Sequence, residues 1–340
     1  MSPSERPGIL IVAPTADITF VAQDVDILSR DYHVEVLARH DHPSLRQLLP
    51  AVAERLRTGR YALVYLWFAE PHDSPWIVLL ARLFRVKCAI AAGGYDVTAL
   101  PALGYGALAD RRGRWKVMAA LQGASAVFPT SDVLADEVRR LGRRRGVRVI
   151  YLGVDCARFA PGPRRERLVV TVGTVGASTW RLKGLDVFAR CSRLVPDARF
   201  VVIGPVEDEA VVAELRALGG DNLEFAGRVS AVEMAGWLGR ATVYAQLSAR
   251  ESFGLALAEA MSAGCVPVVT STGFMPHLVG DTGLQVEYGD TGAAARAIRS
   301  AFDRESGPQA RERVRRFYSV ERRTEALLDG VGRLVGRIAS

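Results

Sequence analysis

Two glutamates eight positions apart are the residues of this chain best placed to bind a polyhydroxylated ligand. Glu251 lies in a predicted loop, and Glu259 lies on the helix expected to follow within RESFGLALAEAMSAG at 250–264. A carboxylate can accept hydrogen bonds from neighbouring hydroxyls of a sugar or a ribose. The alternative for Glu259 is a place on a solvated helix face, and spacing alone does not decide between the two.

The start of this predicted helix is suited to binding an anion. Ser252 is the expected N-cap, because its hydroxyl can accept from a free amide of the first turn. The amides of Phe253, Gly254 and Leu255 would then point out of the helix together with the positive end of its dipole. A diphosphate between two carboxylates fits a nucleotide-sugar.

The same stretch resembles the donor site of retaining GT-B glycosyltransferases of family 4 (glycosyl transferases group 1). The family motif is a Glu, seven residues and a second Glu, and here it reads ESFGLALAE, followed by AMSAGCVPVVTS. The resemblance extends from about residue 149 to the end of the chain and is weaker before it. It implies that Glu251 contacts hydroxyls of the donor sugar and that Glu259 contacts the ribose.

A second glycine-containing loop is expected to supply cations for the diphosphate. Gly173 ends a predicted strand, and Lys183 is one of only three lysines in the chain. The family pattern is a Gly-Arg pair followed by Lys-Gly, whose cations stabilise the leaving group. Lys183 fits this pattern. Thr174 replaces the Arg, and Arg181 is the candidate for the missing charge, so the second cation remains open.

Two further loops are expected to receive the nucleotide base. In the family these loops act largely through backbone groups, and here they contain Gly204 with Pro205 and Arg228 with Val229. Arg228 could stack on the base or donate hydrogen bonds to it. His277 stands where the family often has a Glu, and its role is open between sugar preference and packing.

The acceptor side is expected in the first half of the chain. Gly94, Tyr95 and Asp96 follow a predicted strand, and Asp96 is the candidate to bind or deprotonate an acceptor hydroxyl. The alternative is a turn or helix cap made by Asp96. Thr15 follows the first strand, where the family often has a glycine-rich loop. Asp24 and Asp26 lie on a predicted helix and are interpreted as a solvated face, with no metal site.

Composition limits the classes of partner. The net charge is +7 and the four cysteines are scattered, which is typical of free thiols in a reducing compartment. The polar start predicts no signal peptide, and Trp76–Ala92 is too interrupted by charge to cross a membrane. Arginines cluster at 111–116, 139–148 and 313–323. They indicate either solvated faces or contact with an anionic membrane, whereas no nucleic-acid fold signature is present. The expected location is cytoplasmic, with or without peripheral attachment to the inner face of the membrane.

The elements that must position these residues alternate between strands and helices. Predicted strands in the first half are 8–13, 33–38, 62–66, 86–92, 124–128 and 147–150; those in the second are 168–173, 199–204, 222–226, 242–247, 265–270 and 283–286. Helices are expected, for example, at 20–30, 45–58, 308–317 and 321–338. Alternation of this kind predicts parallel sheets covered by helices.

The resulting fold class is α/β with GT-B architecture, in which two doubly wound Rossmann-like domains have parallel sheets facing a central cleft. We expect an acceptor domain at 1–155 and a donor domain at 156–320, with the helix at about 321–340 packing back on the first domain, as in the family. Ligands of open α/β sheets bind beyond the carboxyl ends of the strands.

The predicted function is transfer of a sugar, of the hexosyltransferase type, from a UDP- or GDP-sugar to a hydroxyl of a carbohydrate, a lipid-linked or a small-molecule acceptor. The resemblance implies retention of configuration, with the departing phosphate assisting deprotonation of the acceptor, and no metal or other cofactor is expected. The alternatives are a nucleotide-sugar epimerase or a sugar phosphorylase of the same fold, and a non-catalytic protein that binds a partner or a membrane surface.

Overall fold

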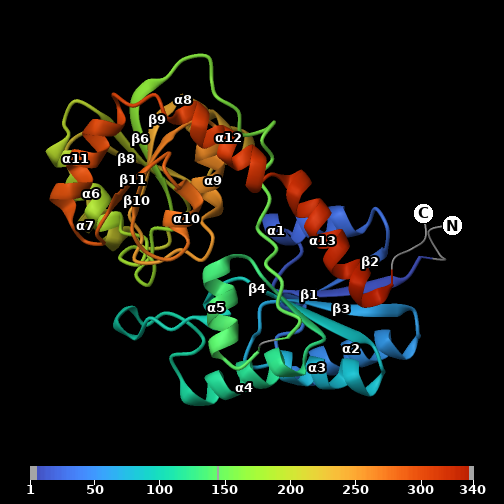
Figure 1. The fold of residues 1–340 in the computed structure, drawn as a ribbon. Helices are drawn as coiled ribbons and strands as arrows, with labels where there is room; N and C mark the ends of the chain where they lie inside the picture. The colour runs from blue at the N-terminus through green and yellow to red at the C-terminus, as the bar shows by residue number, and fades with distance from the viewer. Residues whose placement is uncertain (1–5, 144, 337–340) are drawn as a thin grey trace. The chain divides into compact units, whose positions relative to one another are not determined.

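The computed structural model describes residues 6–143 and 145–336, which divide into two compact units. One unit comprises the chain up to Tyr151 and again from Arg323, and the other is Leu152–Arg322. Each unit is a parallel sheet covered by helices on both faces (Figure 1). The two-sheet α/β fold predicted from the alternation is thereby confirmed.

The first unit has a five-stranded parallel sheet in the order β2-β1-β3-β4-β5. Its strands are β1 (Gly8–Ala13), β2 (His33–Ala38), β3 (Tyr61–Trp67), β4 (Lys87–Ala92) and β5 (Ala126–Pro129), and its helices are α1 (Thr19–Leu28), α2 (Leu45–Arg57), α3 (Ser74–Leu83), α4 (Arg111–Gly123) and α5 (Asp132–Arg140). Figure 1 shows α2, α3 and α4 on one face of the sheet, and α1 with α13 (Val320–Val335) on the other.

The predicted sixth strand of this unit, at 147–150, does not form. The segment follows the edge of β5 for a short distance, where Arg148 N donates to Val127 O and Ile150 N donates to Pro129 O. Only one bridge, between Val127 and Val147, is made before the chain leaves the sheet. Of these four residues only Ile150 is buried, and its side chain lies against α13, 3.2 Å from where a Cβ on Gly330 would stand.

The second unit has a six-stranded parallel sheet in the order β11-β10-β9-β6-β7-β8. Its strands are β6 (Glu166–Val172), β7 (Arg199–Ile203), β8 (Leu223–Gly227), β9 (Ala241–Gln246), β10 (Val266–Thr270) and β11 (Leu284–Val286). Its helices are α6 (Leu185–Leu194), α7 (Glu209–Leu218), α8 (Ala231–Arg240), α9 (Leu255–Ser262), α10 (Met275–Val279), α11 (Thr291–Ala301) and α12 (Gly307–Phe317). The chain moves outward from β6 to β8 and then resumes on the other side of β6 with β9. The point between β6 and β9 is therefore where a ligand site is expected.

Helix α13 is fixed to the first unit by a buried ion pair. The guanidinium of Arg323 donates two hydrogen bonds to Asp24, Nε to Oδ1 at 2.8 Å and Nη2 to Oδ2 at 2.9 Å. Tyr65 also donates to Asp24, at 3.1 Å. Both charged side chains are buried. The interpretation of Asp24 as a solvated residue was wrong, because the carboxylate faces inward to meet a partner 299 positions later in the chain.

Candidate active site

A cavity of about 320 Å³ opens at the carboxyl end of the second sheet, at the switch point between β6 and β9. Its lining comes from the ends of β6, β7 and β9 and from the start of α9, and comprises Val172, Gly173, Thr174, Lys183, Gly204, Pro205, Gln246, Glu251, Gly254, Leu255 and Ala256. The predicted Gly173, Lys183, Gly204, Pro205, Glu251, Gly254 and Leu255 are thus brought together.

An ion pair between Lys183 and Glu251 lies at the wall of this cavity. Lys183 Nζ is 2.7 Å from Glu251 Oε1, and the two side chains are 31% and 13% exposed. The loop around Lys183 is fixed beside the Glu251 loop because Ala249 N donates to Leu182 O at 2.8 Å. Sixty-eight residues separate the two charges in sequence, so this pairing is a product of the fold.

A chain of buried polar side chains orients the carboxylate of Glu251. Tyr244 donates to Gln246 Oε1, and Gln246 Nε2 donates to Ser248 Oγ at 2.7 Å and to Glu251 Oε1 at 3.1 Å. Ser248 Oγ in turn donates to the same carboxylate oxygen at 2.9 Å. Gln246 and Ser248 were missed in the sequence. The available signal was two polar residues at the end of a predicted buried strand.

All donors to Glu251 within the described chain reach one oxygen, Oε1. Oε2 is therefore the oxygen that a ligand hydroxyl can reach without breaking an existing bond. The paired cation and two neutral donors keep the carboxylate ordered at a site that is largely removed from water.

The anion-binding helix end is present but begins later than predicted. Helix α9 starts at Leu255, and its N-cap is Gly254 in the left-handed conformation, with φ of 90° and no side-chain cap. The prediction of Ser252 as N-cap was therefore wrong. The first amides that lack a helical partner belong to Leu255, Ala256 and Leu257, and the first two of these residues line the cavity.

Phe253 is not part of the helix end either. Its ring is 2% exposed and stacks on Phe274 with centroids 5.7 Å apart, while Tyr318 meets it edge-on. Phe274 also stacks on His277, with ring centroids 5.8 Å apart. The side chain of Phe253 thus anchors the loop in the core. The next residue, Gly254, turns the backbone into the helix.

Two glycines allow the loops of the site to approach one another. Gly184 has φ of +64°, and a Cβ there would lie 1.9 Å from Leu247 O. Gly273 has φ of +61°, and its Cβ would lie 2.3 Å from Glu251 O, to which Phe274 N also donates. Any side chain at either position would push apart the loops that carry Lys183 and Glu251.

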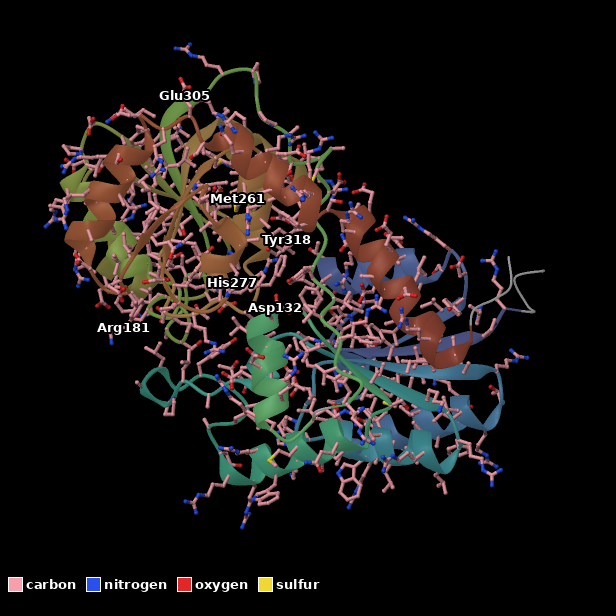
Figure 2. The ribbon with its side chains drawn as sticks, viewed as in Figure 1. Asp132, Arg181, Met261, His277, Glu305 and Tyr318 are labelled. Atoms are coloured by element: carbon pink, nitrogen blue, oxygen red, sulfur yellow. The ribbon has the colours of Figure 1, made fainter. Side chains whose placement is uncertain are left out.

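Besides Ser252, Phe253 and Glu259, three predicted donor residues, Arg181, Arg228 and Val229, do not line the cavity. Arg181 is exposed and lies over the ring of Trp180 at 4.7 Å, while its carbonyl accepts from Tyr288. Arg228 is exposed, and Val229 precedes the capping box of α8 formed by Ser230 with Glu233. Figure 2 shows Arg181 and His277 at the same end of the second unit, and Glu305 at the opposite end. Arg181 is thus at the ligand-binding end without contacting the cavity.

Glu259 lies one turn further along α9 than the cavity-lining residues. The side chain is partly buried, and this burial raises the pKa of the Glu259 carboxyl to about 7, against the opposing charge of Arg158. It is therefore not the freely solvated residue of the alternative interpretation. A carboxyl with this pKa accepts hydrogen bonds when charged and can donate one when neutral.

The predicted acceptor residues lie at the carboxyl end of the first sheet. Asp96 is fully buried and accepts from the backbone N–H of Ala69 at 2.9 Å and of Gly94 at 2.8 Å. Burial raises the pKa of this carboxyl, although the backbone N–H groups oppose the shift. The geometry is that of the turn alternative: Asp96 ties the loop after β4 to the loop after β3, and it has no exposed atom to offer an acceptor.

The neighbours of Asp96 are more accessible. Tyr95 is 46% exposed and meets Tyr105 edge-on at 5.4 Å. Thr15 is partly exposed, and its hydroxyl hydrogen-bonds Asp17, which lowers the pKa of that carboxyl. Gly93 lets the ring of Phe68 approach, since a Cβ would lie 2.1 Å from it, and Phe68 itself has φ of +70°. This strained, non-glycine residue at the end of β3 gave no sequence signal.

The second unit matches a known family over all six strands of its sheet. Residues 166–304 match the family model described as glycosyl transferases group 1. Among curated proteins, the chain is 29% identical over 284 residues to D-inositol 3-phosphate glycosyltransferase of Streptomyces avermitilis, covering 73% of this chain and 59% of that one. It is 38% identical over 144 residues to GDP-mannose:cellobiosyl-diphosphopolyprenol alpha-mannosyltransferase of Komagataeibacter xylinus, covering 40% and 36%. The matched region is less than two thirds of either relative.

Solved structures match over nearly the whole chain. Sucrose-phosphate synthase of Thermosynechococcus elongatus aligns with a TM-score of 0.79 at 20% identity, over 97% of this chain and 99% of that one. HepE of Anabaena, in complex with UDP and glucose, aligns with a TM-score of 0.76 at 17% identity, over 96% and 100%. The chain has the GT-B fold. The predicted architecture is confirmed, and these identities are evidence for the fold alone.

Within the described residues, no three or more His, Cys, Asp or Glu side chains gather in a way that could hold a metal ion. No helix in the described part of the chain is long and apolar enough to span a membrane.

Proposed function

We propose that this chain is a glycosyltransferase that moves a sugar from a nucleotide diphosphate, with UDP or GDP as carrier, to an acceptor hydroxyl with retention of configuration and without a metal. One observation carries the proposal: the Lys183–Glu251 pair lies on a cavity that is also lined by the start of α9 and by the loops after β6 and β7. A cation, free amides and a carboxylate are the groups that a diphosphate joined to a sugar requires.

Each group of the cavity then has a role. The amides of Leu255 and Ala256 and the ammonium of Lys183 bind the diphosphate and stabilise the charge that grows on it as the sugar leaves. Glu251 accepts from sugar hydroxyls through Oε2, and Glu259 accepts from the ribose. Arg181 supplies a second cation by leaving Trp180, while Gly204, Pro205, Arg228 and Val229 surround the base.

Transfer breaks the bond between the anomeric carbon and the diphosphate oxygen and forms a bond from the same carbon to the acceptor oxygen on the same face. The proton of the acceptor hydroxyl passes to the departing phosphate oxygen, so no protein base is needed. Asp96 then acts as a positioning residue for the loop that bears Gly94 and Tyr95, in keeping with its burial. The proposed acceptor is a hydroxyl compound of one of three classes: a carbohydrate, a lipid-linked molecule or a small molecule.

The relatives' names offer donors to test first. The Anabaena structure holds UDP and glucose, and the Komagataeibacter relative is named for GDP-mannose. Thermal shift with UDP, GDP, ADP and dTDP in the presence of EDTA identifies the base, and turnover of the matching sugar donor then identifies the reaction. We expect Lys183→Ala and Glu251→Ala to lower turnover by about 10²-fold or more.

The matched control is Lys87→Ala, an exposed lysine of the first unit, which should leave nucleotide binding unchanged. If Lys183→Ala and Glu251→Ala turned over donor as fast as the wild type, the cavity would not be the donor site. Sugar released or isomerised without an acceptor would point to an epimerase, and a requirement for inorganic phosphate would point to a phosphorylase.

A further inference from the structure

Helix α3 exposes a stripe of large apolar side chains. Trp76, Leu79 and Leu83 are 48%, 56% and 74% exposed. Their spacing of three and four residues places them on one face of the helix. The opposite face is buried and includes Ile77 and Val78. Helix α3 therefore exposes large apolar side chains to solvent even though its other face already packs on the core.

The neighbouring helix α4 continues this surface. It packs on α3 so closely that a Cβ at Gly123 would lie 2.7 Å from Val78, and both helices cover the same face of the first sheet (Figure 1). Trp115 of α4 is 72% exposed. Four cations surround it, all of them exposed: Arg111, Arg112, Arg114 and Lys116.

This surface carries more positive than negative charge. Asp110, the exposed N-cap of α4, lies beside the cations: the backbone N–H of Gly113 and the charge of Arg112 lower the pKa of its carboxyl, but the cations of α4 outnumber it four to one. Neither Ser74–Leu83 nor Arg111–Gly123 contains an Asp or a Glu. The four cations of α4 form no ion pair with any described residue. The other arginine clusters differ: Arg139 and Arg140 pair with acids of their own helix, and Arg323 is buried against Asp24. Of the three clusters, the one at 111–116 is therefore the one in which no cation forms an ion pair with a described residue, whereas each of the other two contains ion-paired arginines.

A cationic hollow lies beside the carboxyl end of α4. It has a volume of about 380 Å³ and is lined by Gln122, Gly142, Arg143 and Arg145. Arg143 donates to the carbonyls of Gln122 and Ser125, while its buried Nε has no partner among the described residues. Burial and the nearby charge of Arg82 lower the pKa of Arg143. Two unneutralised cations at one hollow attract an anionic group.

We propose that the exposed face of α3 and α4, defined by Trp76, Leu79, Leu83, Trp115 and the cations at 111–116, docks on a bilayer that contains anionic lipid. Tryptophan and leucine enter the boundary between headgroups and acyl chains, and arginines bind the headgroup phosphates. The hollow beside Arg143 receives one headgroup phosphate. Charge complementarity selects this occupant, because a protein partner for an apolar face does not call for six cations without an ion pair around it, whereas an anionic bilayer does.

Vesicle flotation tests the surface directly and does not depend on the transfer reaction. We use vesicles of phosphatidylcholine alone and of equal parts phosphatidylcholine and phosphatidylglycerol, without nucleotide. The wild type should float with the anionic vesicles and not with the neutral ones, and added salt should weaken the binding. Trp76→Ser with Leu83→Ser should weaken it by about tenfold or more, and Arg111→Gln and Arg112→Gln by about fivefold each.

Matched variants on the second unit control for exposure alone. Val232→Ser with Phe317→Ser removes two exposed apolar side chains, and Arg315→Gln with Arg316→Gln removes two exposed arginines; both pairs should bind vesicles as the wild type does. Fluorescence then locates the contact. Binding should shift tryptophan emission to the blue. Trp76→Phe with Trp115→Phe should bind but lose the shift, because Trp67 and Trp180 are buried and Trp237 lies on the second unit beneath Arg199 and Arg240.

Three results would overturn the proposal. They are a wild type that does not float with anionic vesicles, equal flotation of the Trp76→Ser, Leu83→Ser variant, and a blue shift that persists in the double phenylalanine variant. A fourth result would assign the face to a second copy of the chain: concentration-dependent dimerisation in sedimentation velocity that Leu83→Ser abolishes. Loss of sugar transfer in the donor-site variants would leave all of these readouts unchanged.

Discussion

The carboxylate of Glu251 is oriented by a neutral side chain as well as by a cation. Gln246 joins it to Tyr244 through one hydrogen bond to each. Gln246→Leu removes a donor to Oε1 and leaves the buried Tyr244 hydroxyl without its acceptor, so we expect a loss of stability of about 1–3 kcal/mol. Nucleotide-sugar affinity should fall by about tenfold, whereas affinity for the nucleotide alone should fall less, because Glu251 contacts the sugar.

Calorimetry with both ligands separates these effects. Gln285→Leu is the control, since Gln285 is an exposed glutamine of the same sheet. Equal losses for nucleotide and nucleotide-sugar would show that Gln246 supports the fold of the whole cavity and does not orient Glu251 in particular.

The raised pKa of Glu259 makes stability depend on pH. The folded protein binds its proton with a pKa of about 7, compared with an ordinary value of 4.5. Between these values the folded state holds more protons than the unfolded state, so the free energy of unfolding falls as pH rises through this window. The contribution is complete below about pH 4.5, is lost above about pH 7, and is of order 2 kcal/mol.

Glu259→Gln should flatten this dependence, because the amide stays neutral throughout. Urea denaturation of both proteins at several pH values in the window measures it. Glu325 is an exposed residue of α13, and Glu325→Gln should keep the wild-type slope of unfolding free energy against pH. A slope in Glu259→Gln equal to that of the wild type would assign the pH dependence to another group.

Chemistry-bearing residues differed in how well the sequence located them. Lys183 and Glu251 were found because a rare lysine and a spaced pair of acids stand out from their surroundings. Ser252 was misplaced because a hydroxyl and a following glycine both favour a helix start, and the left-handed backbone of Gly254 prevailed. Asp24 was interpreted as solvated, and for Asp96 contact with the acceptor and a turn were left as alternatives, because burial of a carboxylate depends on donors from distant segments, which local sequence does not reveal.

At the scale of elements, the loop of Glu251 is held in place by the backbone after β10. Gly273→Ala would place a Cβ against Glu251 O in a conformation that already disfavours a side chain. We expect a loss of stability of about 1–3 kcal/mol and a clear loss of donor binding as the loop moves. Gly289→Ala is the matched control: its φ is +85°, but its Cβ meets nothing within 4 Å.

Thermal unfolding and nucleotide titration of the two variants test this difference. Gly289→Ala should lose about 1 kcal/mol from the backbone alone and bind donor normally. Donor binding that is unchanged in Gly273→Ala would mean that the loop accommodates the methyl group without moving Glu251.

Strands and helices were predicted more accurately than their caps. The bounds of β1 and β2 agree residue for residue with the prediction. β1 is buried along its whole length and is apolar throughout, as a central parallel strand has to be, whereas the edge strand β2 contains His33 and Glu35 and is only partly buried. The segment at 147–150 has three β-branched residues and is not a strand, since it only borders β5 before leaving the sheet. Whether an apolar run pairs along its length depends on its neighbour, which the run itself does not encode.

At the scale of the whole molecule, the end of the chain rejoins the first unit, and one buried ion pair holds it there. Arg323 lies near the start of α13 and also donates to Tyr151 O at 2.6 Å, so it joins the helix both to Asp24 and to the end of the first unit's continuous segment. The resemblance implied a returning helix but could not name its partner. That partner is Asp24 on α1. It was interpreted as part of a solvated face because Arg323 is far away in the sequence.

Breaking this pair should release the returning helix. Arg323→Met leaves Asp24 as an uncompensated buried charge, and we expect it to cost about 3–5 kcal/mol of unfolding free energy. Asp24→Asn combined with Arg323→Met removes both charges and should recover part of that loss, since the desolvation cost disappears with the carboxylate. Arg333→Met, which breaks an exposed pair with Asp329 on the same helix, should cost less than about 1 kcal/mol.

Urea denaturation gives the energies, and limited proteolysis followed by mass spectrometry shows whether cleavage begins within α13. A double variant no more stable than Arg323→Met, or a cleavage pattern unchanged from the wild type, would mean that packing of α13 on the sheet, and not the ion pair, holds the helix to its unit.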